Sequence, residues 1–116
     1  SRVHPGESNA SWVIQGVIEF LLEKNNQNAE ILRKNFIFKI VPMLNPDGVI
    51  NGNFRTSLIG KDLNRLWDDP RENICPTIYY TKEMIKKTLL SRDVFIYCDF
   101  HGHSNKPNFF FVWLPL

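Results

Sequence analysis

The chain alternates between stretches with helical periodicity and short runs rich in Val, Ile and aromatic residues. Over residues 9–24, apolar side chains recur at helical spacing on one face, as at Val17 and Leu21. Residues 36–41 instead form a compact apolar run that stops at Pro42 and is typical of a strand. This alternation predicts an α/β layered fold in which helices cover a largely buried sheet.

Two helices, a short helical turn and three strands are expected, with one long loop among them. The helices are predicted at residues 9–24 and 76–90, the helical turn at residues 29–34, and the strands at residues 36–41, 93–100 and 108–113. Ser8 or Asn9 can cap the first helix, and Pro76 suits the first turn of the last one. Residues 45–75 show no clean period, and a loop of this length in a compact domain is usually functional.

Composition and charge narrow the class of protein. The chain has 116 residues, 43% of them apolar and 13% aromatic, which suffices for one globular domain with a real core. The net charge of +2 is not concentrated in a basic run, so it gives no electrostatic case for a nucleic-acid or membrane partner. No apolar stretch approaches the roughly 20 residues that cross a bilayer.

Both ends of the sequence are expected to be cuts within a larger domain. The chain starts at Ser1 without a methionine and ends in the apolar run 109–116, which reads as a buried strand. A natural terminus usually frays into polar residues. The N-terminus shows no signal-peptide pattern, and Cys75 and Cys98 are interpreted as reduced thiols of a cytoplasmic protein.

One candidate metal site combines residues from both ends of the chain. His4 and Glu7 flank a Pro-Gly pair whose tight turn can aim both side chains at one point. A catalytic zinc site takes three protein ligands and leaves one position for water. The third ligand would be His101 or His103, at the end of a predicted strand. Side chains two apart on a strand share a face, so the residues alone leave both histidines open.

The long loop contains candidate anion-binding residues. Arg55, Asn64 and Arg65 lie close in sequence. An arginine side chain can bind a carboxylate through two parallel hydrogen bonds, and an asparagine adds a neutral donor. The simpler alternative is a set of surface salt bridges, which charged loop residues usually form. Asp62 could belong to such a pair, or it could orient a metal-bound histidine through the second ring nitrogen.

Five segments together resemble one family in content and order. They are His4–Trp12, Asn45–Ile50, Gly52–Arg55, Asp62–Trp67 and Asp99–Ser104. The ordered set resembles the cytosolic carboxypeptidases, a branch of the zinc carboxypeptidase clan whose members remove glutamates from tubulin and other proteins. The resemblance implies an α/β/α sandwich with a mixed central sheet. It makes residues 1–116 the N-terminal part of a catalytic domain that is truncated at both ends.

The resemblance also assigns metal-binding roles. His4, Glu7 and His101 match the protein ligands of one Zn²⁺ ion, which chooses His101 over His103. Asp62 matches the carboxylate that binds the second ring nitrogen of the first ligand histidine. These assignments follow from the family motifs and not from the spacing of the residues.

The remaining roles concern the substrate and the proton. Arg55 matches the arginine that polarises the scissile carbonyl and stabilises the oxyanion. Asn64 and Arg65 match the pair that binds the substrate's terminal carboxylate. The family's general base is a glutamate on a later strand, and Glu72 and Glu83 lie in the wrong context to replace it. The 116-residue chain by itself is therefore expected to be inactive, and marginally stable because its strand edges are unpaired.

Three functions are compatible with these residues. The first is a zinc metallocarboxypeptidase that removes C-terminal residues, with glutamates of acidic protein tails such as that of tubulin as the expected substrate. The alternatives are a zinc amidohydrolase that deacylates small N-acyl amino acids and a non-catalytic fragment or pseudoenzyme that binds acidic tails. The motif context at residues 45–48 and 62–65 favours the peptidase over the deacylase. No nucleic-acid or membrane partner is expected.

Overall fold

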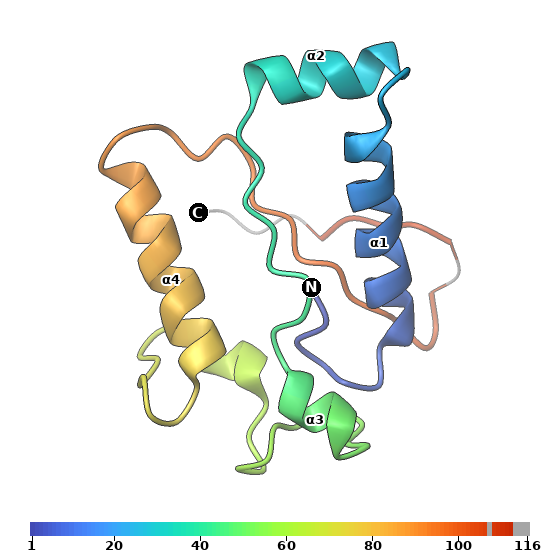
Figure 1. The fold of residues 1–116 in the computed structure, drawn as a ribbon. Helices are drawn as coiled ribbons and strands as arrows, with labels where there is room; N and C mark the ends of the chain where they lie inside the picture. Colours follow the sequence, from blue (N-terminus) through green and yellow to red (C-terminus); the bar gives the residue numbers. More distant parts are fainter. Residues whose placement is uncertain (107, 113–116) are drawn as a thin grey trace.

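The computed structural model describes residues 1–106 and 108–112 and consists of helices joined by extended segments and turns (Figure 1). The helices are α1 (Ser8–Leu22), α2 (Gln27–Asn35), α3 (Pro46–Ile50) and α4 (Pro76–Leu89), with a 3-10 helix, η1, at Leu63–Arg65. The helices predicted at residues 9–24 and 76–90 are confirmed with small shifts at their ends, and the predicted turn at 29–34 is part of the longer α2. Within the described residues, no helix is long and apolar enough to cross a membrane.

The starts of α1 and α2 use different signals. The side chain of Asn26 caps α2 by accepting hydrogen bonds from two backbone N–H groups of its first turn. For α1, the predicted cap at Ser8 or Asn9 is wrong, because Glu7 occupies the N-cap position and its side chain makes no cap hydrogen bond. The Glu7 carboxylate instead contacts two histidine rings.

The three predicted strands do not form in the part of the chain that the structure describes. Residues 36–41, 93–100 and 108–112 belong to no ladder of backbone hydrogen bonds. Residue 113, the end of the third predicted strand, lies outside the described residues. The α/β/α sandwich with a mixed central sheet is therefore not formed by these residues, which present helices alone.

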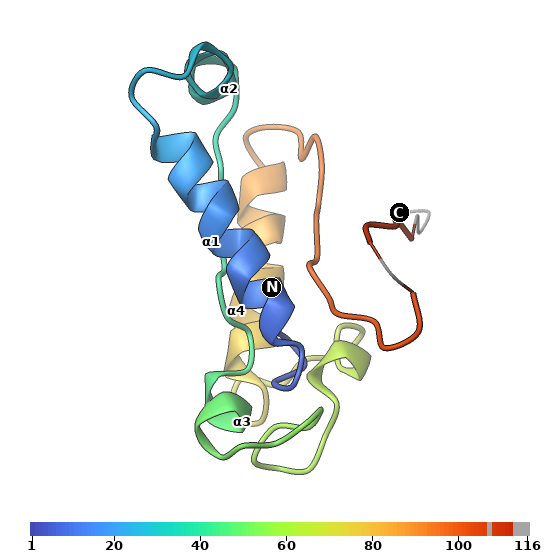
Figure 2. The ribbon, with the colours of Figure 1, turned by 90° about the vertical axis from the view of Figure 1, so that its right-hand side faces the viewer.

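The missing sheet has a geometric cause. The segments 36–41 and 93–100 run on either side of the N-terminus (Figures 1 and 2). The amino group of Ser1 donates a hydrogen bond to the Val41 carbonyl at 3.1 Å and lies 3.7 Å from the Asp99 carboxylate. Paired strands lie about 4.8 Å apart, and the two segments exchange no backbone hydrogen bond across the space between them. β propensity extends a segment, but a ladder needs a second edge within hydrogen-bonding distance.

Unpaired segments leave apolar side chains in solvent. Ile37 is 63% exposed, Phe95 79% and Phe109 86%. The C-terminal run that was expected to be buried is therefore exposed over residues 109–112. Exposed apolar side chains on unpaired edges favour association with other chains, which is the physical basis of the marginal stability predicted for the isolated chain.

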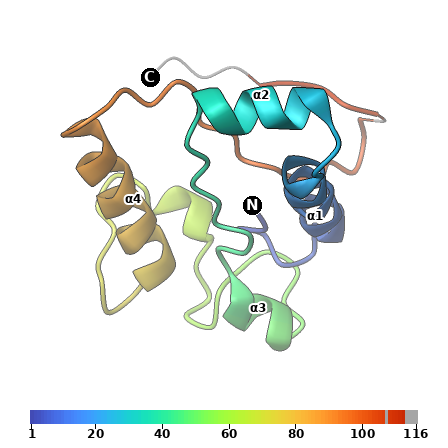
Figure 3. The same ribbon diagram turned by 45° about the horizontal axis from the view of Figure 1, so that its top comes forward.

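The buried core surrounds the N-terminal residues. It consists of Val3, Leu44, Leu63, Cys75 and Ile78. These side chains come from the N-terminal turn, the chain before α3, η1 and the start of α4, so the core joins segments that are far apart in sequence. Burying a large apolar side chain contributes about 1.5–3 kcal/mol. The N-terminus is thereby fixed between α1 and α4 (Figure 3), and both cysteines are free thiols.

Candidate metal centre

The turn that contains His4 is held by the loop before α3. Asn45 is fully buried, and its side-chain amide donates a hydrogen bond to the Val3 carbonyl at 3.1 Å. Its side-chain oxygen accepts from the Gly48 N–H at 3.0 Å, which caps α3. Gly48 packs so closely on Pro5 that an added Cβ would lie 2.5 Å from the proline ring. The asparagine and the glycine together fix the backbone on both sides of His4.

Gly6 brings the loop of Arg55 against the same turn. Its N–H donates a hydrogen bond to the Phe54 carbonyl at 2.7 Å. A Cβ on Gly6 would lie 2.6 Å from the Phe54 ring and 2.8 Å from that carbonyl oxygen. Only glycine permits so close an approach of the two backbones. The contact therefore holds the residue before Glu7 against the residue before Arg55.

Three side chains then converge from the two ends of the chain. His4 and Glu7 come from the turn before α1, and His101 comes from the segment after α4. One ligand atom from each lies within 4.8 Å of the others. Glu7 contacts the Nδ1 atom of His4 at 2.8 Å and the Nδ1 atom of His101 at 3.0 Å. The Gly102 N–H also donates to the Glu7 carboxylate at 2.9 Å.

Each histidine also contacts a second carboxylate through its other ring nitrogen. The Nε2 atom of His4 lies 3.1 Å from Asp62, and the Nε2 atom of His101 lies 2.8 Å from Asp99. A neutral imidazole has one N–H, so only one of the two contacts of each ring can be a hydrogen bond. In a neutral ring, the other nitrogen has a lone pair that faces a carboxylate oxygen, and this contact is unfavourable. It becomes favourable if that nitrogen is protonated, or if a cation lies between the nitrogen and the carboxylate.

Protonation and charge are coupled in this cluster. The hydrogen bond to Asp99 raises the pKa of His101, and the nearby Glu7 charge acts in the same direction. Burial acts to raise the pKa of Asp99, but His101 and the N-terminal amino group together lower it, so the pKa lies below its ordinary value. Burial likewise acts to raise the pKa of Asp62, and the Asn64 N–H together with His4 and Arg55 lowers it overall. The two aspartates are therefore held ionised behind the histidines.

The donor set fits a zinc ion. Zinc sites that catalyse reactions use neutral histidine nitrogens with one carboxylate and leave a position for water. Tetrahedral zinc separates its ligand atoms by roughly 3.4 Å, and one ligand atom from each of the three residues lies within 4.8 Å of the others, so the three donors lie near the spacing that one ion requires. With Nε2–H bound to an aspartate, each Nδ1 lone pair is free to bind a cation. His4, Glu7 and His101 could therefore hold the metal.

Asp62 links the metal cluster to Arg55. One carboxylate oxygen contacts His4, and the other accepts a hydrogen bond from the Arg55 Nε–H at 2.9 Å. The backbone N–H of Asn64 donates to the first oxygen at 2.9 Å. Arg55 keeps 44% of its side chain exposed, so its remaining N–H groups can reach a ligand in solvent. The structure thus brings Arg55 beside the cluster through a shared acidic partner.

Asn64 is oriented by a tryptophan that the sequence reasoning did not single out. The Trp67 indole N–H donates to the Asn64 side-chain oxygen at 2.8 Å, and the Trp67 ring packs edge-on against Tyr97. Because an indole can only donate, it fixes which end of the amide faces it. The amide N–H₂ group then remains available to another partner. Arg65 is exposed and donates to the Asn64 carbonyl at 3.4 Å, so the structure does not bring its side chain to the cluster.

Three other sequence candidates lie apart from the cluster. The Nδ1 atom of His103 accepts hydrogen bonds from two backbone N–H groups, at residues 105 and 106. Glu83 pairs with Lys86 on α4, and Glu72 accepts a hydrogen bond from the Tyr80 hydroxyl. None of the three belongs to the group of possible metal ligands.

Asp99 is the functional candidate that the sequence reasoning missed. A signal for it existed, because residues 99 and 101 stand two apart on an extended segment and therefore share a face. An acidic residue that follows an apolar run and comes just before a candidate ligand histidine points to this arrangement.

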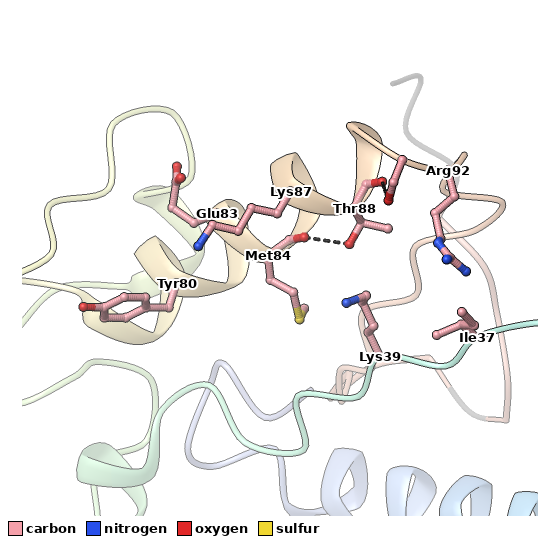
Figure 4. A pocket seen from close by; sticks show the side chains of 9 residues that line it. Ile37, Lys39, Tyr80, Glu83, Met84, Lys87, Thr88 and Arg92 are labelled. Atoms are coloured by element: carbon pink, nitrogen blue, oxygen red, sulfur yellow. Dashed lines mark hydrogen bonds between the residues drawn. The ribbon is translucent and has the colours of Figure 1, made fainter.

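A cavity of about 430 Å³ lies between α4 and residues 37–39 (Figure 4). Met84 points from α4 towards that segment, and Lys39, Lys87 and Arg92 are among the residues that line the cavity. It contains no histidine and no member of the metal cluster. The candidate metal ligands therefore lie outside this cavity.

The sequence of the chain is similar to those of known proteins. The zinc carboxypeptidase family model matches residues 1–113. The chain is 56% identical over 110 residues to cytosolic carboxypeptidase 2 of Mus musculus, which covers 95% of the chain and 13% of that protein. It is 56% identical over 111 residues to cytosolic carboxypeptidase 1 of Homo sapiens, covering 95% of the chain and 9% of that protein.

The fold is similar to that of a solved enzyme. The crystal structure of a metallo-carboxypeptidase from Burkholderia cenocepacia superposes with a TM-score of 0.70 and 36% sequence identity. The match covers 74% of this chain and 24% of that one. The chain thus spans a small fraction of the length of the proteins that it resembles.

Proposed function

The chain belongs to the zinc carboxypeptidase family, and from this premise we propose that it supplies the zinc ligands and substrate-binding residues of a metallocarboxypeptidase. In this proposal, residues 1–116 are the N-terminal part of the catalytic domain. The observation that carries the proposal is the convergence of His4, Glu7 and His101, with a carboxylate behind each histidine. This arrangement joins residues from opposite ends of the chain.

His4, Glu7 and His101 would hold one Zn²⁺ ion. A zinc ion in such a site acidifies bound water and polarises a carbonyl group. Asp62 would accept the Nε2–H proton of His4, which would keep the Nδ1 atom of that ring turned towards Glu7. The resemblance places the general base on a glutamate outside residues 1–116, in agreement with the position of Glu72 and Glu83 away from the cluster.

Arg55 would stabilise negative charge on the scissile carbonyl oxygen. Its guanidinium lies beside the cluster because Asp62 holds the Nε–H, and among the described residues its other N–H groups have no hydrogen-bond partner. A preorganised donor of this kind, aimed at an oxyanion, contributes about 2.7–4 kcal/mol to transition-state stabilisation. Asp62 would position the arginine without contacting the substrate.

Asn64 and Arg65 would bind the free carboxylate of the substrate. The Asn64 amide presents its N–H₂ donors because Trp67 occupies its oxygen. Arg65 is exposed and can close on a carboxylate when substrate is present. An internal peptide bond offers no such carboxylate, so this pair would make the enzyme an exopeptidase.

The proposed substrates are C-terminal glutamates of acidic protein tails, such as that of tubulin. The support is the resemblance to the cytosolic carboxypeptidases, which are also the closely related proteins in the comparisons. The name of these relatives agrees with a cytoplasmic location. The small net charge of +2 supports no nucleic-acid or membrane partner.

The test uses the full-length protein loaded with zinc. We expect release of glutamate from a peptide that ends in several glutamates, and no release from the same peptide with an amidated C-terminus. An acylated glutamate in a parallel reaction tests for the deacylase. Turnover of the acylated glutamate alone would replace the peptidase with the deacylase, and binding of the tail without any turnover would make the protein a non-catalytic binder.

A further inference from the structure

We propose that Asp99 is a positioning residue that binds the Nε2–H of His101 and thereby turns Nδ1 of that ring towards the metal. The proposal rests on the zinc ligation by His101 proposed above. The contact between Asp99 Oδ2 and His101 Nε2 measures 2.8 Å, and only 15% of the Asp99 side chain is exposed. The Asp99 carboxylate contacts Nε2 of His101 in the same way that the Asp62 carboxylate contacts Nε2 of His4.

Within the described residues, the Asp99 carboxylate makes no hydrogen bond other than the contact to His101. Its second oxygen, Oδ1, is buried and has no hydrogen-bond partner among the described residues, the nearest cationic group being the Ser1 nitrogen at 3.7 Å. Burying a carboxylate without full compensation is unfavourable for folding. It follows the apolar run 94–98, where an apolar side chain would fit the pattern. Its one hydrogen-bond partner among the described residues is His101, and the Ser1 amino group is a more distant ion-pair partner, so the directed contact of this carboxylate is the one to His101.

The pair forms within one short segment. Residues 99 and 101 lie on the same face of an extended chain, with Cα atoms about 7 Å apart. The Asp62–His4 contact instead spans 58 positions and depends on the long loop. The third ligand therefore has its orienting group on its own segment, independent of the long loop.

The residue after His101 is fixed as well. The Gly102 N–H donates to Glu7, and the Asn9 side chain lies so close that a Cβ on Gly102 would be 2.5 Å from the Asn9 oxygen. His101 is thus set between a carboxylate that binds its far nitrogen and a backbone N–H that binds the neighbouring ligand. Both constraints leave Nδ1 as the nitrogen that faces Glu7.

The experiment measures zinc affinity of the full-length protein by competition with a chelator. In the Asp99→Asn variant we expect the zinc dissociation constant to rise about 10–100-fold, as for other partners of metal-bound histidines. Asp93→Asn, on the same segment and exposed, is the matched control and is expected to bind zinc as the wild type does. Circular dichroism of the zinc-free variants checks that each is folded.

Two spectroscopic readouts separate positioning from a purely structural role. The visible spectrum of the cobalt-substituted Asp99→Asn protein is expected to change in shape, which loss of stability alone does not produce. In the zinc-loaded wild type, ¹⁵N NMR of the histidines is expected to show His101 bound to the metal through Nδ1 with a proton on Nε2. This measurement needs no variant and decides the question even if Asp99→Asn fails to fold.

The outcomes that contradict the proposal are distinct from those that contradict the peptidase. A folded Asp99→Asn protein with wild-type zinc affinity overturns the role of Asp99, and so does wild-type His101 bound to zinc through Nε2. Failure of the wild type to bind zinc overturns both. Absence of peptide cleavage with zinc bound overturns the peptidase alone, because the affinity and NMR readouts do not depend on turnover.

Discussion

Replacing Gly6 with alanine tests whether the close approach of two backbones builds the metal centre. A Cβ at this position would lie 2.8 Å from the Phe54 carbonyl oxygen, where ordinary contact begins at 3.4 Å. The ring of Phe54 is 79% exposed and can swing aside, but the carbonyl must retreat by about 0.6 Å to relieve the overlap. That movement also weakens the 2.7 Å hydrogen bond from the Gly6 N–H.

We expect Gly6→Ala to lower the local stability of the turn by about 2 kcal/mol, within the range for overpacked sites. Because Glu7 is the next residue, its carboxylate shifts and the zinc dissociation constant rises about tenfold. Gly16→Ala is the matched control. Gly16 lies inside α1 with nothing within 4 Å of an added Cβ, so alanine there stabilises the helix by about 0.5–1 kcal/mol.

The assay is hydrogen exchange of the full-length protein, read in peptides that cover residues 1–8 and 44–57, together with zinc affinity by chelator competition. Exchange in those peptides reports the local opening free energy. Faster exchange and weaker zinc binding are expected in Gly6→Ala, and neither in Gly16→Ala. A Gly6→Ala protein that exchanges as slowly as the wild type and binds zinc equally well would refute the reasoning.

Three further predictions address the residues around the metal cluster. Asp62→Asn removes the charge that holds both His4 and Arg55, so zinc affinity is expected to fall about 10–100-fold and kcat/KM to stay low even at saturating zinc. Asp69→Asn, at an exposed position, is the control. Full recovery of kcat/KM at saturating zinc would show that Asp62 does not position Arg55. Trp67→Phe removes the donor to Asn64 and is expected to raise KM about 2–10-fold, the value of one hydrogen bond, with a smaller effect on kcat; an unchanged KM would count against the oriented amide. The raised pKa of His101 stabilises the zinc-free fold below the unfolded pKa of about 6.5, and this stabilisation is lost as pH rises through the folded pKa. Because zinc displaces the proton of His101, calorimetry of zinc binding in buffers of different ionisation enthalpy is expected to detect proton release near pH 6.5. The absence of proton release would contradict the contact with Asp99.

The helices were predictable from the sequence because their signals are local. The apolar spacing over residues 9–24 and the proline at position 76 locate α1 and α4 to within two residues. The strand predictions used equally local signals at residues 36–41 and 93–100, but a ladder depends on a neighbour that periodicity does not specify. The cap of α1 was mispredicted for a different reason. Glu7 is a poor capping residue, yet it stands there because its carboxylate faces two histidines.

The metal ligands of the candidate site were predictable from the sequence, but the residues that orient these ligands and Asn64 were less so. Spacing alone left His101 and His103 equal, and the family motif chose His101, the one that lies in the cluster. His103 is instead occupied by backbone N–H groups, which no side-chain pattern reveals. Asp99 and Trp67 act through neighbours, so their importance appears only when the contacts of His101 and Asn64 are known.

The most direct test of the account is the zinc content of the full-length protein and two histidine variants. Elemental analysis after dialysis is expected to find one zinc per molecule in the wild type and in His103→Ala, and a large loss in His101→Ala. Retention of zinc by a folded His101→Ala protein, or its loss from His103→Ala, would contradict the assignment of His4, Glu7 and His101 as the metal ligands.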